Sequence, residues 1–266
     1  MSRTMFSRVL ALGLIVVAGQ APAAAPQPFD LSRPFALPAG WKLIGSQGPG
    51  VEDAGGNPAP GPLHLCITRD DGKTCHPALD DILASPGEHG DFDVAHYLNM
   101  VRVVHPRAGR PLLWVEAASI HGGNGDQLVG RMALAFDRNS GGFVTVFRQT
   151  TGRNNNQDIR YVDQGPLNGT IISAVPTQDA PFGFWIVVNR MASDGRYAPV
   201  LRYRSGTRYG DGNTLAVIDS EMPEIQRRLN LWKPGQPLPL PDQPCPRPHL
   251  VKTVLWCAAP PARGKS

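Results

Sequence analysis

The sequence predicts a mainly β protein: an antiparallel β-sandwich, barrel or small propeller-like body of about ten strands with one short C-terminal helix. Glycine (29) and proline (27) together make up 56 of the 266 residues, about 21%, against roughly 12% in average proteins. Both residues destabilise helix interiors. Hydrophobic residues (41%) are too frequent, and charged residues (18%) too few, for a disordered chain. The glycines follow no three-residue period, which excludes a collagen.

The first 23 residues have the features of a secretory signal peptide. Arg3 and Arg8 form its positive start, Val9–Ala18 is an apolar run, and Ala21–Ala23 fits the cleavage pattern of small residues. The apolar run is shorter than the roughly 20 residues that span a membrane, so we favour cleavage over a retained anchor. We therefore expect a soluble protein that is secreted or periplasmic after cleavage near Ala23.

The charge of the mature chain is modest. Removal of Arg3 and Arg8 with the signal peptide lowers the formal net charge from +4 to +2. Nucleic-acid-binding proteins carry a basic stripe together with a recognition motif, and the sequence has neither. No later segment reaches 18 consecutive apolar residues. We therefore expect no nucleic-acid partner and no membrane span in the mature chain.

Four cysteines suit an exported protein, because disulfides persist in oxidising compartments. Pairing between neighbours in the sequence predicts the bridges Cys66–Cys75 and Cys245–Cys257, although four cysteines allow three connectivities. The first bridge would close a turn. The second would tie the last strand to a proline-rich segment.

We divide the mature chain into three parts. Residues 24–61 form an irregular leader rich in proline and glycine, residues 62–232 a single β-rich domain, and residues 233–266 a proline-rich strap with a final strand packed on that domain. Ten runs rich in β-branched and aromatic residues, separated by glycine and asparagine turns, predict strands. They are Leu63–Thr68, Met100–Val104, Leu112–Ala118, Leu128–Phe136, Phe143–Arg148, Thr170–Val175, Gly183–Asn189, Pro199–Arg204, Thr214–Asp219 and Lys252–Cys257.

Two segments predict helices. Pro77–Leu83 is long enough for two turns. The second helix has Ser220 as its N-cap and Glu221 in the first turn, where the helix dipole favours a carboxylate. Its apolar stripe consists of Met222, Ile225, Leu229 and Trp232.

Seven prolines within Pro234–Pro248 predict an extended, polyproline-like strap. A bridge at Cys245 would hold this strap on the body of the protein. The alternative is a recognition ligand for a protein partner.

Two stretches resemble each other at an offset of 54 residues: Phe143–Arg148 and Tyr197–Arg202. They either mark a repeated β unit or reflect the general similarity of hairpins.

The common catalytic signatures are missing. The sequence has no G-x-S-x-G elbow, no P-loop and no H-E-x-x-H zinc motif. A carboxylate enzyme needs no local motif, so Asp219 and Glu221 are candidates for acid–base chemistry. His121 beside a glycine-rich turn, oriented by Asp126, is a second candidate base.

The densest polar cluster lies between residues 202 and 221. Strand alternation places Arg202 and Arg204 on one face, with Leu201 and Tyr203 on the opposite, buried face. Two neighbouring guanidinium groups can bind a carboxylate or phosphate bidentately. The alternative is a solvated strand face balanced by nearby acids. The candidate ligand-binding residues are Arg202, Arg204, Arg208, Asp211, Asn213, Asp219 and Glu221.

We expect no cofactor, with calcium as the alternative, because Ca²⁺ takes carboxylate and amide oxygens on glycine-bearing loops. Its ligands would be Asp211, Asn213, Asp219 and Glu221, or separately Asn124 and Asp126. Thiolates and imidazoles could instead bind copper or zinc. That site would consist of His64, Cys66, Cys75 and His76.

Together these features predict an exported, disulfide-stabilised binding protein that holds an acidic or polyhydroxylated ligand near Arg202, Arg204 and Asp211. One alternative is a carboxylate-based hydrolase that uses Asp219 or Glu221. The other is an interaction or inhibitor protein that uses the proline-rich strap.

Overall fold

The computed structural model describes residues 26–83, 94–106, 110–122, 126–152, 157–208 and 211–258. The expected signal peptide, residues 1–23, lies outside this range. Among the described residues, no helix is long and apolar enough to cross a membrane.

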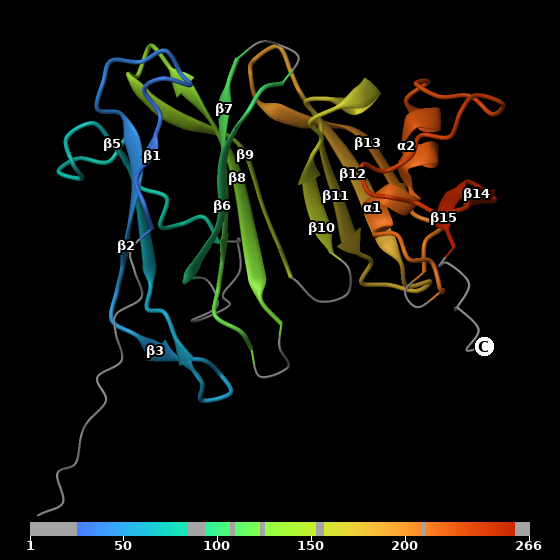
Figure 1. Cartoon of the computed structure of the whole chain (residues 1–266), viewed down its shortest axis with the longest axis horizontal. Coiled ribbons are helices and arrows are strands. Elements are labelled where there is room, and N and C mark those ends of the chain that lie inside the picture. The colour runs from blue at the N-terminus through green and yellow to red at the C-terminus, as the bar shows by residue number, and fades with distance from the viewer. Residues whose placement is uncertain are drawn as a thin grey trace, which may run out of the picture.

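Three antiparallel sheets follow one another along the long axis of the molecule, and two short helices lie beyond the third sheet (Figure 1). The N-terminal sheet has the order β1-β2-β5, with bounds Phe29–Asp30, Lys42–Gln47 and Leu63–Thr68. The central sheet has the order β6-β7-β8-β9, with bounds Tyr97–Val104, Leu112–Ala118, Leu128–Asp137 and Gly142–Gly152. The C-terminal sheet has the order β10-β11-β12-β13, with bounds Asp158–Tyr161, Ile171–Pro176, Phe184–Met191 and Tyr197–Arg204.

Smaller elements complete the described fold. Two-stranded ribbons are formed by β3 (Val51–Glu52) with β4 (Pro58–Ala59), and by β14 (Pro248–Val251) with β15 (Val254–Cys257). The α-helices are α1 (Val217–Ser220) and α2 (Met222–Arg228), and Gly165–Leu167 forms a short 3-10 helix. The mainly β, antiparallel fold class with a short C-terminal helical segment is confirmed, and in the described residues no sheet closes into a barrel.

Strand β7 of the central sheet is buried on both of its faces. Leu113 and Val115 belong to the core that the central sheet shares with the N-terminal sheet. Leu112 and Trp114, which point the other way, pack with Tyr161 and other residues of the C-terminal sheet. Because neither face of β7 is solvated, its sequence is almost continuously apolar and does not alternate with polar residues.

The leader, which we expected to be irregular, contributes strands β1 to β4 to the fold. Strand β2 pairs along its whole length with β5, and Trp41 and Leu43 are buried in the shared core. Strand β2 escapes detection because its partner β5 lies outside the segment, and β1, β3 and β4 have only two residues each.

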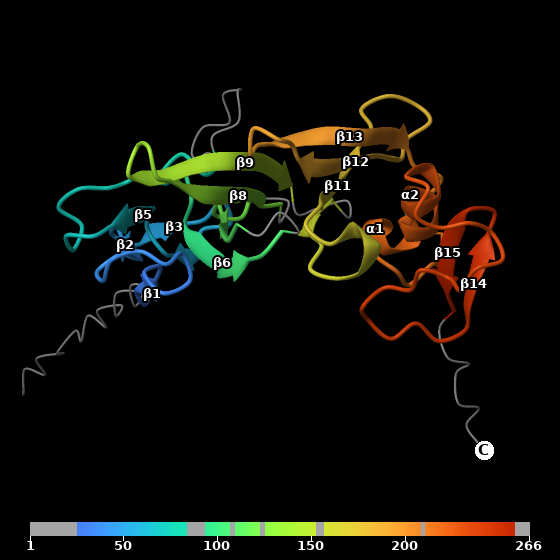
Figure 2. The ribbon, with the colours of Figure 1, turned by 90° about the horizontal axis from the view of Figure 1, so that it is seen from above.

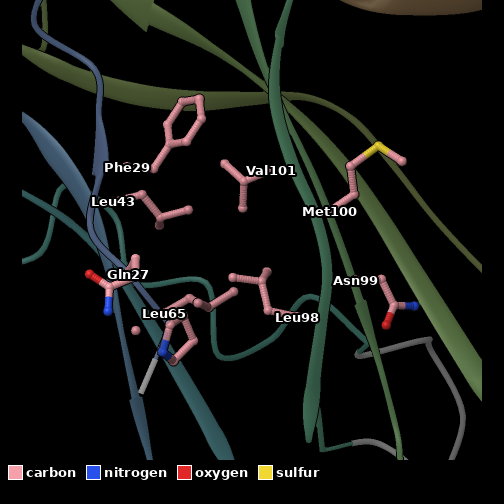
Figure 3. A pocket seen from close by; sticks show the side chains of 10 residues that line it. Gln27, Phe29, Leu43, Leu65, Leu98, Asn99, Met100 and Val101 are labelled. Atoms are coloured by element: carbon pink, nitrogen blue, oxygen red, sulfur yellow. The ribbon is translucent and has the colours of Figure 1, made fainter. Parts of the chain in front are cut away.

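An apolar cleft remains between the N-terminal sheet and strand β6 (Figure 3). It measures about 190 Å³, and Leu98 and Val101 of β6 face Phe29, Leu43 and Leu65 across it. No ionisable side chain of the described residues lines this cleft, so it offers apolar contact without charge recognition.

The two four-stranded sheets have the same connectivity. In each, four consecutive strands pair in chain order as a meander. The similar stretches Phe143–Arg148 and Tyr197–Arg202 lie in β9 and β13, the fourth strand of each meander, and Figure 2 shows these strands along the same side of the molecule. The two similar stretches therefore occupy the equivalent strand in two sheets with the same strand order.

Two elements differ from the sequence-based predictions. Thr214–Asp219 is not a strand, because Val217–Ser220 forms helix α1, all of whose residues are buried. Pro77–Leu83 is not a helix: the backbone of Ala78 bridges to Cys66, and Leu79 N–H donates to the Leu65 carbonyl. The backbone of Ala78 and Leu79 therefore pairs with the free edge of β5 and not with a preceding helical turn.

The C-terminal helical segment is broken in two at Glu221. Ser220 ends α1 and is not the N-cap of α2, whose N-cap position is Glu221. The expected apolar stripe is nevertheless on the inner face, since Met222, Ile225 and Trp232 are all buried. The spacing of the apolar residues therefore predicted which side chains of the helical segment are buried. The capping pattern at Ser220 did not predict where α2 begins.

The first of the two expected disulfides is present. Cys66 and Cys75 are bonded, with Cα atoms 5.2 Å apart. Cys245 and Cys257 are not bonded, and each thiol instead lies near a backbone carbonyl: Cys257 Sγ is 3.4 Å from the Pro246 oxygen. Burial, together with the neighbouring Cys257, raises the pKa of the Cys245 thiol to about 11. The expected second bridge is therefore corrected to a pair of neighbouring thiols.

The strap is nevertheless docked on the body. Trp232 Nε1 donates a 3.0 Å hydrogen bond to the Pro237 carbonyl. This bond joins the start of the strap to the buried Trp232, four residues after the end of α2.

We predict that removing the first disulfide destabilises the fold. The variant Cys66→Ala with Cys75→Ala should lose about 2–3 kcal/mol of unfolding free energy, because the bridge closes a loop of sequence separation 9 and restricts the unfolded chain. Urea denaturation measures the loss. The control Cys245→Ala removes an unbridged thiol and should lose clearly less; equal losses would contradict the prediction.

Candidate ligand-binding surfaces

Arg202 and Arg204 lie side by side on β13, as strand alternation predicts. Trp185 on the adjacent strand β12 pairs with Arg204 in the register, and its ring is the platform for both arginines. The guanidinium carbon of Arg202 is 4.2 Å from the ring centroid and that of Arg204 is 5.3 Å away. We call Trp185, Arg202 and Arg204 the arginine surface.

The opposite face of β13 is apolar, also as expected. Tyr203 is buried and Leu201 is half-buried, and both pack in the core between the C-terminal sheet and the helices. The arginine surface is therefore the outer face of a strand whose inner face is fixed by packing.

The two arginines differ in their partners. Arg204 forms an ion pair with Asp179, with Nη2 and Oδ1 2.7 Å apart. Arg202 is exposed and makes no ion pair within the described residues. The loop that carries Asp179 also presents Phe182, whose side chain is 75% exposed. The arginine surface therefore contains one cation without an ion-pair partner in the described residues, Arg202, over the aromatic ring of Trp185.

The predicted acids are not part of this surface. Glu221 is buried on the inner side of the sheet, where Tyr203 Oη donates to its Oε2 at 2.8 Å. Its Oε1 accepts from the backbone of Gly206 and from both the backbone and the hydroxyl of Thr207. Burial and the adjacent Glu221 carboxylate raise the pKa of Tyr203, so the phenol keeps its proton and donates. Glu221 therefore holds the chain after β13 against the helices.

Asp219 also lies on the inner side. Its Oδ1 is 2.5 Å from Nη1 of Arg160, whose Nη2 is 3.0 Å from Asp158. Arg160 stands opposite Ile172 in the register and so shares its helix-facing side of the sheet. The C-terminal sheet thus separates Asp219 and Glu221 from Arg202 and Arg204.

The remaining predicted site residues are dispersed. Asn213 is structural, because its side chain donates to Ser220 Oγ and to the Leu255 carbonyl. Asp211 is exposed and accepts a hydrogen bond from the Asn213 backbone at 2.9 Å. Arg208 is exposed. None of the three is hydrogen-bonded to the arginine surface among the interactions of the described residues.

Asp219 opens onto a groove that sequence reasoning did not identify. The groove has a volume of about 630 Å³. Its polar wall contains Arg102, Arg160, Asp163 and Asp219, and its apolar wall is the strap 236–242. We call it the strap groove. In the sequence, only the prolines of the strap and Asp219 had drawn attention to this region. No sequence pattern near Arg102 of β6 predicts that it lies next to them.

Two polar atoms of the strap groove residues are buried and without a hydrogen-bond partner. They are Nε of Arg102 and the hydroxyl of Tyr161. The guanidinium of Arg102 lies 5.7 Å from the centre of the Tyr161 ring, and its Nη1 is 2.7 Å from Asp163. Unpaired buried donors are rare and call for an explanation.

The described residues contain no cluster of three or more histidine, cysteine or acidic side chains able to hold a metal ion. The Cys66–Cys75 bond occupies both thiols of the copper or zinc alternative. In the calcium alternative, Asp219 and Glu221 are already paired with other groups, and Asn124 lies outside the described residues.

His121, the second candidate base, packs against Tyr97, with ring centres 6.1 Å apart.

No family model matches the chain, and comparisons with curated proteins and with solved structures also find no match.

We predict that Glu221 is a structural residue. Glu221→Gln should lower the free energy of unfolding by about 3 kcal/mol, because it turns a buried acceptor of four hydrogen bonds partly into a donor. Thermal and urea denaturation measure this loss. The control Glu52→Gln changes an exposed acid of β3 and should stay within about 0.5 kcal/mol. A tolerated Glu221→Gln would refute the structural role.

Proposed function

We propose that this chain is an exported, soluble binding protein whose arginine surface holds a ligand carboxylate or phosphate. The observation that carries the proposal is the stacking of two guanidinium groups on one indole ring, with Arg202 left without an ion-pair partner in the described residues. The signal-peptide pattern and the Cys66–Cys75 bond support an export route to the periplasm or the cell exterior.

The ring of Trp185 and the charges around it support binding in two ways. Cation–π attraction holds each guanidinium over the ring face, so less side-chain entropy is lost when a ligand binds. Arg204 is already balanced by Asp179, whereas Arg202 has no ion-pair partner in the described residues, so a ligand anion beside Arg202 would gain the attraction of an uncompensated cation. The planar forks of arginine then match a carboxylate or phosphate bidentately.

The hydrolase alternative receives less support from the geometry. A catalytic carboxylate must reach a substrate, whereas both oxygens of Glu221 are buried and hydrogen-bonded. Asp219 is ion-paired to Arg160. The interaction-protein alternative needs an accessible strap, and the strap packs along its own groove, although Leu240 is still exposed.

We predict that the arginine surface binds acidic ligands. In isothermal titration calorimetry with oligogalacturonate and, separately, with inorganic phosphate, the mature protein should bind at least one of them. Arg202→Ala with Arg204→Ala should then weaken binding at least tenfold, because a charge-assisted hydrogen bond contributes about 1.5–3 kcal/mol. Trp185→Ala should weaken it less, since the charges remain.

The matched control is Arg190→Ala with Arg196→Ala, which removes the same charge from two exposed arginines of the same hairpin. Its affinity should stay within twofold of the wild type. Equal losses in the two double variants would show a general charge effect and reject a defined site.

A further inference from the structure

Strand β13, which carries both arginines of the arginine surface, is an edge strand of the C-terminal sheet. In the described residues it pairs with β12 alone, and Figure 2 shows it at the rim of the sheet beside β12. Pro199, Val200 and Arg202 are exposed along this strand. An open edge presents backbone N–H and C=O groups to which an extended peptide can add as a further strand.

The backbone groups of Arg202 and Arg204 point to this open edge. Just after β13, the Ser205 N–H donates to the Phe184 carbonyl of β12 at 2.8 Å. In an antiparallel ladder, alternate residues bond to the same neighbouring strand. Every second residue counted back from Ser205 therefore bonds to β12, whereas the N–H and C=O groups of Arg202 and Arg204 face the open edge. These four groups have no backbone partner within the described residues.

The first half of the edge is closed to regular pairing. Pro199 has no backbone N–H, and the register with β12 shifts between Val188 and Asn189, next to the residue that pairs with this proline. Prolines and bulges are devices that limit pairing along an edge. They leave Leu201–Arg204 as the stretch that can accept a strand, and this stretch contains both arginines.

A strand added to this stretch has its side chains placed by the ladder. Residues directly opposite each other in an antiparallel pair share a face, with Cβ atoms about 4.5–5.5 Å apart. The two peptide residues opposite Arg202 and Arg204 therefore lie on the outer face, beside the guanidinium groups. The residue between them lies on the inner face, where Leu201 and Tyr203 pack in an apolar core. The complementary sequence is an acid, an apolar residue and a second acid.

The two arginines differ in what they offer to such a peptide. Arg204 is balanced by Asp179, 2.7 Å away, whereas Arg202 has no ion-pair partner in the described residues. Both guanidinium groups lean over Trp185 of β12, at 4.2 and 5.3 Å from its ring centre. A carboxylate must therefore reach across β13 from the open edge, which favours glutamate over the shorter aspartate. The carboxylate beside Arg202 gains the larger attraction.

We propose that the ligand of the arginine surface is an extended acidic peptide of a partner protein, which adds to β13 as an antiparallel strand. This inference rests on the proposed function and names its ligand. Four backbone hydrogen bonds to Arg202 and Arg204 hold the peptide, and two glutamates separated by one apolar residue select it. Because the added strand runs opposite to β13, its first glutamate stands opposite Arg204 and its second opposite Arg202.

The probe is the peptide Ac-Thr-Val-Glu-Val-Glu-Val-Thr-NH2, titrated into mature protein by isothermal titration calorimetry. It should bind, and Arg202→Ala with Arg204→Ala should weaken the binding at least tenfold. Replacing the second glutamate by glutamine should weaken binding more than replacing the first, because Arg204 already has Asp179 as its partner. The control Ac-Thr-Val-Glu-Glu-Val-Val-Thr-NH2 should bind at least fivefold more weakly, since neighbouring residues of a strand point to opposite faces.

N-methylation of the peptide tests the backbone pairing without changing the protein. Methylating both glutamate nitrogens removes the N–H groups that face β13 and should weaken binding at least tenfold. Methylating the nitrogen of the central valine, which faces away from β13, is the matched control and should leave the affinity within threefold. In the complex, hydrogen exchange of the Arg202 and Arg204 amides, measured by NMR, should slow at least tenfold.

Three outcomes would overturn the proposal: the peptide does not bind; the two N-methylated peptides bind equally well; or phosphatidylglycerol vesicles bind through Arg202 and Arg204 while the peptide does not. If oligogalacturonate or phosphate still depends on the two arginines in these cases, the proposed function stands and only strand addition is wrong. If Arg202→Ala with Arg204→Ala changes the binding of none of these probes, both are wrong.

Discussion

The burial of strand β7 on both faces is the constraint on which the rest of the structure depends. Leu113 and Val115 hold the N-terminal sheet, and Trp114 holds the C-terminal sheet through contact with Tyr161. Because one strand serves two cores, the three sheets stack in sequence and do not close on themselves. This stacking also places β6 beside the start of the C-terminal sheet, where Arg102 reaches the ring of Tyr161.

The C-terminal sheet separates two kinds of chemistry. Its inner face uses Glu221 and Asp219 to attach the helices, since a buried carboxylate is tolerated only when it is fully hydrogen-bonded or paired. Its outer face leaves Arg202 exposed over Trp185. Acids and arginines that are neighbours in sequence therefore lie on opposite sides of the sheet: the acids are bonded inside the fold, whereas Arg202 is exposed and Arg204 pairs with Asp179 at the surface.

The sequence predicted the bounds of a strand best where the residues of that strand alone had strand-like composition. The bounds of β5 and β7 agree with the prediction because their β-branched and aromatic runs end at polar turns. Thr214–Asp219 has the same composition but forms part of a helix, since its apolar residues are buried by the C-terminal sheet and by β15. The pairing of Arg202 with Arg204 was predictable because it needs only the two-residue period of a strand.

The sequence alone determined the fold class, the turn-rich β architecture and the shared face of the two arginines, and it favoured the Cys66–Cys75 bond among three possible connectivities. Each of these depends on residues within a few positions of one another. Only the tertiary structure decided that Glu221 is structural, that Cys245 and Cys257 are unbonded, and that Arg102 and the strap enclose one groove. The physical reason is that each of these depends on contacts between distant segments, which packing of the sheets brings together and no local pattern encodes.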